Sequence, residues 1–210
     1  MTKRIFNLFV GCILLLIPSF VHATIFTVTN ANDAGTGSLR AAVSAANLDA
    51  NAPHVIVFDA AFFNEPRTIT LLTALPSLTR NTTITGPLSP QTLTIIGTGS
   101  GFRLFAFGAI TATLENLRIS VTNSNQGGAI ANVGSGATIT FLNCEIFETV
   151  NSSNAAISAQ TGSVVNITGC TFRNNAALTG AALRINAGSL NITNSTFTAN
   201  SAGSGGAVYC

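Results

Sequence analysis

The chain has 210 residues, of which 47% are hydrophobic and 8% are charged, and its formal net charge at pH 7 is +2. An intrinsically disordered chain is excluded, because disorder requires few apolar residues and a high net charge. A nucleic-acid-binding surface is excluded as well, because it requires a dense cluster of Lys and Arg. Beyond Ile119 the only charged residues are Glu145, Glu148, Arg173 and Arg184.

The first 23 residues have the organisation of a secretory signal peptide. Lys3 and Arg4 precede an apolar stretch over residues 5–21, and Ala23 supplies the small residue that a signal peptidase requires. A membrane anchor would need a longer apolar run. A lipoprotein cysteine would stand at the end of the apolar stretch, whereas Cys12 lies inside it. We therefore predict an exported protein whose mature chain inserts no segment into the membrane.

Residues 24–66 are predicted to form an N-terminal cap of strand, helix and strand. A strand over 25–29 precedes Ser38, which is a suitable helix N-cap residue. The helix is expected to end at Asn47, and a second strand follows over 55–58. The helix has an apolar stripe with the spacing of one face, made of Leu39, Ala42, Val43 and Ala46. Such an amphipathic helix is expected to cover the open apolar end of a solenoid.

A repeat governs the rest of the chain. After short predicted strands over 69–72, 83–85 and 93–96, four similar segments begin at residues 112, 139, 165 and 190, which gives a period of 25 to 27 residues. Apolar and polar residues alternate within each segment, as in a strand. This period, with about three short strands per turn, predicts an all-β, right-handed parallel β-helix over 67–210. The alternatives are a leucine-rich repeat, which needs regular Leu between the strands, and an antiparallel sandwich.

The alternation breaks once in each segment, always at the same column. The residues of this column are Asn116, Asn143, Gly169 and Asn194. Asn and Gly tolerate a left-handed backbone better than other residues do. We therefore predict a one-residue left-handed corner that joins two short strands in every turn.

The mature chain has three cysteines, which is a poor disulfide framework because the count is odd. Cys144 and Cys170 occupy one inward column in adjacent turns, where strands stack at roughly 4.8 Å, and a disulfide accepts about 4.4–6.8 Å between Cα atoms. Leu117 and Ser195 fill the same column without bonding. We therefore favour two buried thiols, with a disulfide as the alternative.

Short motifs recur in order along the mature chain. They include Thr-Val-Thr-Asn at 27–30, Gly-Ser-Leu-Arg at 37–40 and Ile-Val-Phe-Asp at 56–59, and Phe-x-x-Asn occurs at 172–175 and 197–200. The first three resemble the N-terminal cap of large bacterial secreted β-helix proteins of the pectin lyase-like superfamily. The last is similar to the repeats of chlamydial polymorphic outer membrane proteins. The resemblance implies a pectin lyase-like architecture and export to the cell surface, in association with the outer membrane.

The residues in the repeats do not form a catalytic, cofactor or metal site, and we predict none. Polysaccharide lyases and hydrolases with this fold need clustered carboxylates, or Lys and Arg near a uronic carboxylate. Glu115 and Glu145 fall in different columns, and Glu145 lies one turn above Arg118, which predicts an ion pair between turns. His54 has no Cys or carboxylate cluster beside it and is expected to be structural or exposed.

These observations favour a non-enzymatic extracellular or cell-surface protein with a structural or adhesive role. Its expected partner is a glycan or protein of a host or cell surface. The alternative is a polysaccharide lyase or hydrolase whose active site lies on turns beyond Cys210, since the chain stops just inside a new turn and the β-helix is expected to be truncated there.

Overall fold

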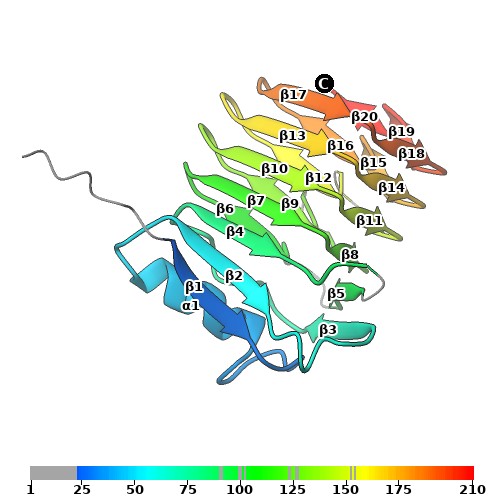
Figure 1. Cartoon of the computed structure of the whole chain (residues 1–210). Coiled ribbons are helices and arrows are strands. Elements are labelled where there is room, and N and C mark those ends of the chain that lie inside the picture. Colours follow the sequence, from blue (N-terminus) through cyan, green and yellow to red (C-terminus); the bar gives the residue numbers. More distant parts are fainter. Residues whose placement is uncertain are drawn as a thin grey trace, which may run out of the picture.

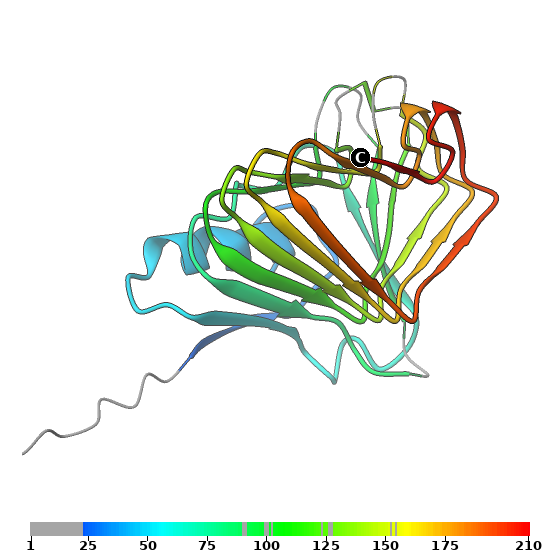
Figure 2. The same cartoon turned by 90° about the horizontal axis from the view of Figure 1, so that it is seen from above.

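The protein folds as a parallel β-solenoid of about seven turns (Figures 1 and 2). The computed structural model describes residues 23–89, 92–98, 101, 103–122, 124–125, 128–151, 153 and 155–210. All of the predicted signal peptide except Ala23 therefore lies outside the described residues. Every strand pairing among the described residues is parallel, which confirms the all-β solenoid and leaves no place for an antiparallel sandwich.

The strands stack into three main sheets that run along the solenoid (Figure 1). Sheet A contains β1 Thr24–Val28, β2 His54–Phe58, β4 Thr82–Thr85, β7 Thr111–Glu115, β10 Thr138–Leu142, β13 Val164–Thr168 and β17 Ser189–Thr193. Sheet B contains β3 Arg67–Leu71, β5 Leu93–Gly97, β8 Arg118–Val121, β11 Glu145–Phe147, β14 Thr171–Arg173 and β18 Thr196–Thr198. Sheet C contains β6 Phe105–Phe107, β9 Ala131–Val133, β12 Ile157–Ala159, β16 Leu183–Ile185 and β20 Val208–Tyr209. A small two-stranded sheet pairs β15 Ala176–Thr179 with β19 Ser201–Ser204.

The register of these strands is the one that the repeat predicts. Ile139 pairs with Ala112 in the preceding turn and with Val165 in the next, and Val165 pairs in turn with Leu190. The turns therefore differ in length by one residue at a time, and the difference is absorbed in the loops rather than in the strands. The strands over 25–29, 55–58, 69–72, 83–85 and 93–96 are also present, with ends shifted by one or two residues. Whether residues 24–66 form a separate cap domain stays a prediction, and β1 and β2 are the first two strands of sheet A.

The predicted corners between sheets A and B are left-handed. The backbone φ is 56° at Asn116, 51° at Asn143, 64° at Gly169 and 49° at Asn194. A single residue in this conformation redirects the chain from one sheet to the next without a loop. The corner therefore keeps the two strands of each turn in register with those of the turns above and below.

The core consists of columns of inward-facing side chains, and each turn contributes one residue to a column. One column on sheet A contains the fully buried residues Ile56, Ile84, Leu114, Phe141 and Ile167. Burial of each such side chain contributes roughly 1.5–3 kcal/mol. The next residue of the column, Ile192, stacks on Ile167 but is 42% exposed, because no described turn covers its other side. The column is thus protected only where it has a neighbouring turn on both sides.

The helix α1, Leu39–Leu48, lies beside β1 and β2 at one end of the sheets (Figure 1). The Ser38 hydroxyl accepts a hydrogen bond from the Ala41 N–H, which confirms the predicted N-cap. The buried residues of the helix are the four of the predicted stripe, Leu39, Ala42, Val43 and Ala46. The helix ends one residue later than predicted, at Leu48. Its role as the cap of the solenoid stays a prediction.

Candidate functional site

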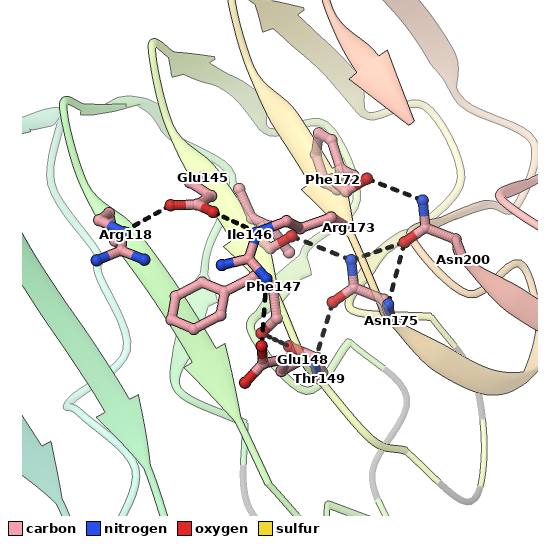
Figure 3. A network of polar contacts seen from close by, with 10 residues as sticks. All are labelled: Arg118, Glu145, Ile146, Phe147, Glu148, Thr149, Phe172, Arg173, Asn175 and Asn200. Atoms are coloured by element: carbon pink, nitrogen blue, oxygen red, sulfur yellow. Dashed lines mark hydrogen bonds and ion pairs between the residues drawn. The ribbon is translucent and has the colours of Figure 1, made fainter. Parts of the chain in front are cut away.

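A charged network crosses three turns on the outer face of sheet B (Figure 3). Arg118 on β8 donates from Nε to Glu145 Oε2 on β11 at 2.6 Å, which confirms the predicted ion pair. Arg173 on β14 donates from its own Nε to the other oxygen, Oε1, also at 2.6 Å. Glu145 therefore lies between two guanidinium groups, one in the turn below and one in the turn above. We name these three residues the Arg–Glu–Arg triad.

Phe147 and Glu148 complete this network. The Phe147 ring lies under both guanidinium groups, with its centroid 5.0 Å from the Arg118 carbon Cζ and 4.8 Å from that of Arg173. Arg173 also reaches Glu148, from Nη1 to Oε1, at 3.2 Å. Each ion pair at such a partly exposed site contributes about 0.2–1 kcal/mol, and each cation–π contact about 0.5–1 kcal/mol. The network thus fixes the positions of its side chains more than it stabilises the fold.

The state of the Glu145 carboxylate follows from these contacts. Partial burial raises the pKa of Glu145, but the hydrogen bonds and charges of Arg118 and Arg173 together outweigh burial and lower the pKa below its usual value. Glu145 is therefore ionised at neutral pH, and each of its oxygens already accepts a hydrogen bond. A carboxylate in this state does not serve as a general acid.

The participation of Arg173 was not predicted from the sequence. Arg173 pairs in register with Phe147, not with Glu145, so its place in the repeat is two residues away from the Glu145 column. Its long side chain crosses this distance diagonally, because residues i and i+2 of a strand lie on the same face. The signal in the sequence was the presence of Phe147 and Arg173 in one outward column next to that of Arg118 and Glu145.

A shallow groove of about 370 Å³ lies beside the triad, over the bend between sheets A and B. It is lined by the left-handed corner residues Asn116, Asn143 and Gly169 and by Arg118 and Glu145 of sheet B. Residues of the segment that joins β4 to β5 also line it. The groove brings charged, amide and hydroxyl groups of the described residues together.

An asparagine ladder runs inside the corner that follows sheet B, and it explains the Phe-x-x-Asn motif. Asn175 is fully buried. Its Nδ2 donates to the Ile146 carbonyl at 3.1 Å, and its Oδ1 accepts from the Thr149 N–H, also at 3.1 Å (Figure 3). Asn200 repeats the arrangement one turn later, since its Nδ2 donates to the Phe172 carbonyl at 2.9 Å. Each Asn therefore satisfies backbone groups of the turn before it.

Where the motif lacks its Asn, a hydroxyl takes the place of the amide. Thr149 occupies the position one turn before Asn175, and its Oγ1 accepts from the Val121 N–H at 3.4 Å. The side chain is almost fully buried. The departure of this turn from the motif is thus a substitution of one hydrogen-bonding group for another.

Cys144 and Cys170 are buried free thiols in adjacent turns, as favoured from the sequence. The Cys144 N–H lies 3.4 Å from the Cys170 sulfur, and the two Sγ atoms lie 3.3 and 3.4 Å from the carbonyl oxygens of Leu114 and Phe141. The contact with Cys170 and burial both raise the pKa of Cys144 well above its ordinary value. Because the thiolate is the reactive form, this cysteine is protected chemically as well as sterically.

We expect alkylation of the folded protein to modify the exposed Cys210 and to leave Cys144 and Cys170 unmodified. Addition of denaturant without reductant is expected to make both buried thiols reactive. Peptide mapping by mass spectrometry measures the modification of each cysteine separately. A Cys144–Cys170 cross-linked peptide from unreduced protein would contradict this expectation.

The remaining candidate residues have structural surroundings. The ring of His54 is fully buried, contacts the Phe26 ring edge to face and has its Nε2 3.2 Å from the Asp49 carbonyl oxygen. Glu115 lies on sheet A, where its Oε2 accepts from the Thr85 hydroxyl at 3.4 Å. In the part of the chain that the structure describes, no three residues among His, Cys, Asp and Glu are placed to share a metal ion.

Comparison with known proteins adds no relative. No protein-family model matches this chain, and no curated protein is significantly similar to it. Among the described residues, no helix has the length and apolar character needed to cross a membrane.

Proposed function

We propose that this protein is a non-enzymatic structural or adhesive β-solenoid of the pectin lyase-like type, exported to the cell surface. The observation that carries the proposal is the engagement of the carboxylates of Glu145 and Glu148 by arginines. Both oxygens of Glu145 are bonded to arginines, and Glu148 is bonded to Arg173. Catalysis of glycan cleavage requires a positioned acid or base that is free to exchange a proton with substrate.

The outer face of sheet A supports an adhesive role. It presents a ladder of polar, uncharged side chains, in which Asn166 donates to the Thr140 hydroxyl at 3.3 Å and accepts from Asn191 Nδ2 at 2.9 Å. Rows of hydroxyl and amide groups held in register provide repeated hydrogen-bonding sites for a glycan or an extended polypeptide. The signal peptide predicted for residues 1–23 and the resemblance to polymorphic outer membrane proteins support the location.

We expect the purified protein to release no unsaturated or reducing products from polygalacturonate or alginate above the buffer background. Ultraviolet absorbance of unsaturated uronates and a reducing-end assay measure the two possible reactions. Products that disappear on Glu145→Gln or Glu115→Gln substitution would overturn the proposal.

The adhesive part requires a separate measurement. Beads coated with the protein are expected to be retained on immobilised cell-surface glycans or on cells more strongly than beads coated with the Thr140→Ala/Asn166→Ala/Asn191→Ala variant. Equal retention of the two sets of beads would reject the sheet A ladder as the adhesive surface.

A further inference from the structure

Two residues that line the groove over the bend between sheets A and B, Arg118 and Asn116, have hydrogen-bond donors that the protein itself does not use. Arg118 lines the groove and bonds Glu145 through Nε alone. Neither terminal nitrogen, Nη1 or Nη2, has a partner among the described residues. Figure 3 shows both pointing away from Glu145. These two groups form the planar fork that binds a carboxylate, sulfate or phosphate in a bidentate manner.

A second unused donor belongs to Asn116, two residues before Arg118 in the same groove. Its amide nitrogen Nδ2 is shielded from solvent and has no hydrogen-bond partner. An unsatisfied shielded donor costs roughly 1–3 kcal/mol. Because nothing holds this nitrogen, turning the amide toward a ligand in the groove breaks none of its hydrogen bonds.

Hydroxyl groups add to this set of donors. Ser89, Thr92 and Thr171 line the groove, and none of their hydroxyls makes a hydrogen bond to another described residue. A hydroxyl also accepts, but the fork of Arg118 and the amide nitrogen of Asn116 only donate. The groove therefore favours a group that is rich in acceptor oxygens.

The charged groups in and beside the groove balance one another. Of the Arg–Glu–Arg triad, Arg118 and Glu145 line the groove and their charges cancel, whereas Arg173 lies outside its lining. Arg173 is also paired with Glu148, so the network of two arginines and two glutamates is neutral as a whole. Glu145 also lines the groove, but both of its oxygens are engaged by arginines.

We propose that this groove is an oxyanion-binding site, which takes a small ligand through a carboxylate, sulfate or phosphate group held by the Arg118 fork and the Asn116 amide. The groove volume of about 370 Å³ accommodates a ligand of about the size of one sugar residue. The site lies at the bend, away from the outward ladder of sheet A, and its existence does not depend on where the protein is located.

The test is a titration of the purified protein with inorganic phosphate, sulfate, D-glucuronate and uncharged D-glucose, followed by nuclear magnetic resonance of side-chain N–H groups. At least one of the three anions is expected to saturate the site and to shift the Arg118 Nε–H and Asn116 amide signals. D-glucose, which has nearly the size of D-glucuronate but no charge, is expected not to do so. The anion that binds most tightly identifies the source of the oxyanion.

Two variants and two matched controls locate the binding. Arg118→Gln is expected to weaken binding by about tenfold or more. Asn116→Gly is expected to weaken it several-fold without unfolding, because Gly169 already occupies the equivalent left-handed corner two turns later. The controls are Arg184→Gln, which makes the same change of charge on sheet C, and Asn143→Gly, which changes the next corner.

Saturation by D-glucose at the same concentration as D-glucuronate would overturn the proposal, and so would the absence of saturation by all three anions. An equal loss on Arg184→Gln would overturn it too, because it would show attraction to net charge alone. If Arg118→Gln alters the circular dichroism spectrum, the test of the site is the comparison of Asn116→Gly with its control Asn143→Gly. Weaker anion binding by Asn116→Gly supports the site, and equal affinities of the two variants reject it.

Discussion

Replacement of Ile167 by Asp is expected to unfold the C-terminal turns of the solenoid. Ile167 is fully buried between Phe141 in the turn below and Ile192 in the turn above. The substitution removes roughly 1.5–3 kcal/mol of burial and places an unpaired carboxylate in an apolar column, so we expect a total loss of about 4 kcal/mol or more. Urea unfolding followed by circular dichroism measures the loss.

Asn166→Asp is the matched control, since it introduces the same side chain one residue earlier. Asn166 faces outward, and the substitution removes only its donation to the Thr140 hydroxyl, while the acceptor for Asn191 remains. We expect a change of about 0.5 kcal/mol. If the two substitutions proved equally harmful, the inward and outward assignment of this strand would be wrong.

The damage caused by Ile167→Asp is expected to be local. In a solenoid each turn contacts only its neighbours, so stability is approximately a sum over turns and the interfaces between them. Hydrogen exchange is therefore expected to accelerate in β10, β13 and β17 and to change least in α1 and β1, which lie several turns away. Uniform acceleration along the whole chain would indicate a single cooperative unit instead.

Asn175→Ala is expected to destabilise the protein by about 3 kcal/mol, although it removes only one polar side chain. The Asn175 amide satisfies the Ile146 carbonyl and the Thr149 N–H and also donates to Asn200 Oδ1 at 2.9 Å. The Ile146 carbonyl and the Thr149 N–H belong to buried residues, and each one left unsatisfied costs roughly 1–3 kcal/mol. The free energy of unfolding from urea titration measures this loss.

Two further variants separate this explanation from a general effect of removing an Asn. Asn191→Ala removes an outward asparagine with one exposed hydrogen bond, to Asn166, and is expected to cost about 0.5 kcal/mol. Asn175→Thr is expected to recover part of the lost stability, because Thr149 fills the same position one turn earlier with a hydroxyl. Similar losses for Asn175→Ala and Asn191→Ala would mean that the buried ladder has no special role.

The sequence predicted the register of the backbone more completely than it predicted the contacts on the outer surface. The register of Ala112, Ile139, Val165 and Leu190 was predicted correctly because each side chain stacks on its equivalent, and stacking selects similar residues in every turn. The α1 stripe was predicted for a related reason, since one face of a short helix is buried and its spacing is fixed. Both features depend on local periodicity, which the sequence contains.

The outer contacts follow a different rule. Arg118 and Glu145 share a column and were paired from the sequence, but Arg173 and Phe147 join them diagonally, by the reach of long side chains across turns. The role of Asn175 likewise requires knowledge of which backbone groups the corner leaves unpaired.

The sequence by itself therefore determined the period, the register, the left-handed corners and the inward columns of this solenoid, because each is a repeated choice of residue type at a fixed spacing. Only the tertiary structure decided that Glu145 is held between two arginines, that the Arg118 fork remains unused and that a groove opens beside it. These properties depend on side-chain direction and on the shape of the bend, and neither repeats from one turn to the next.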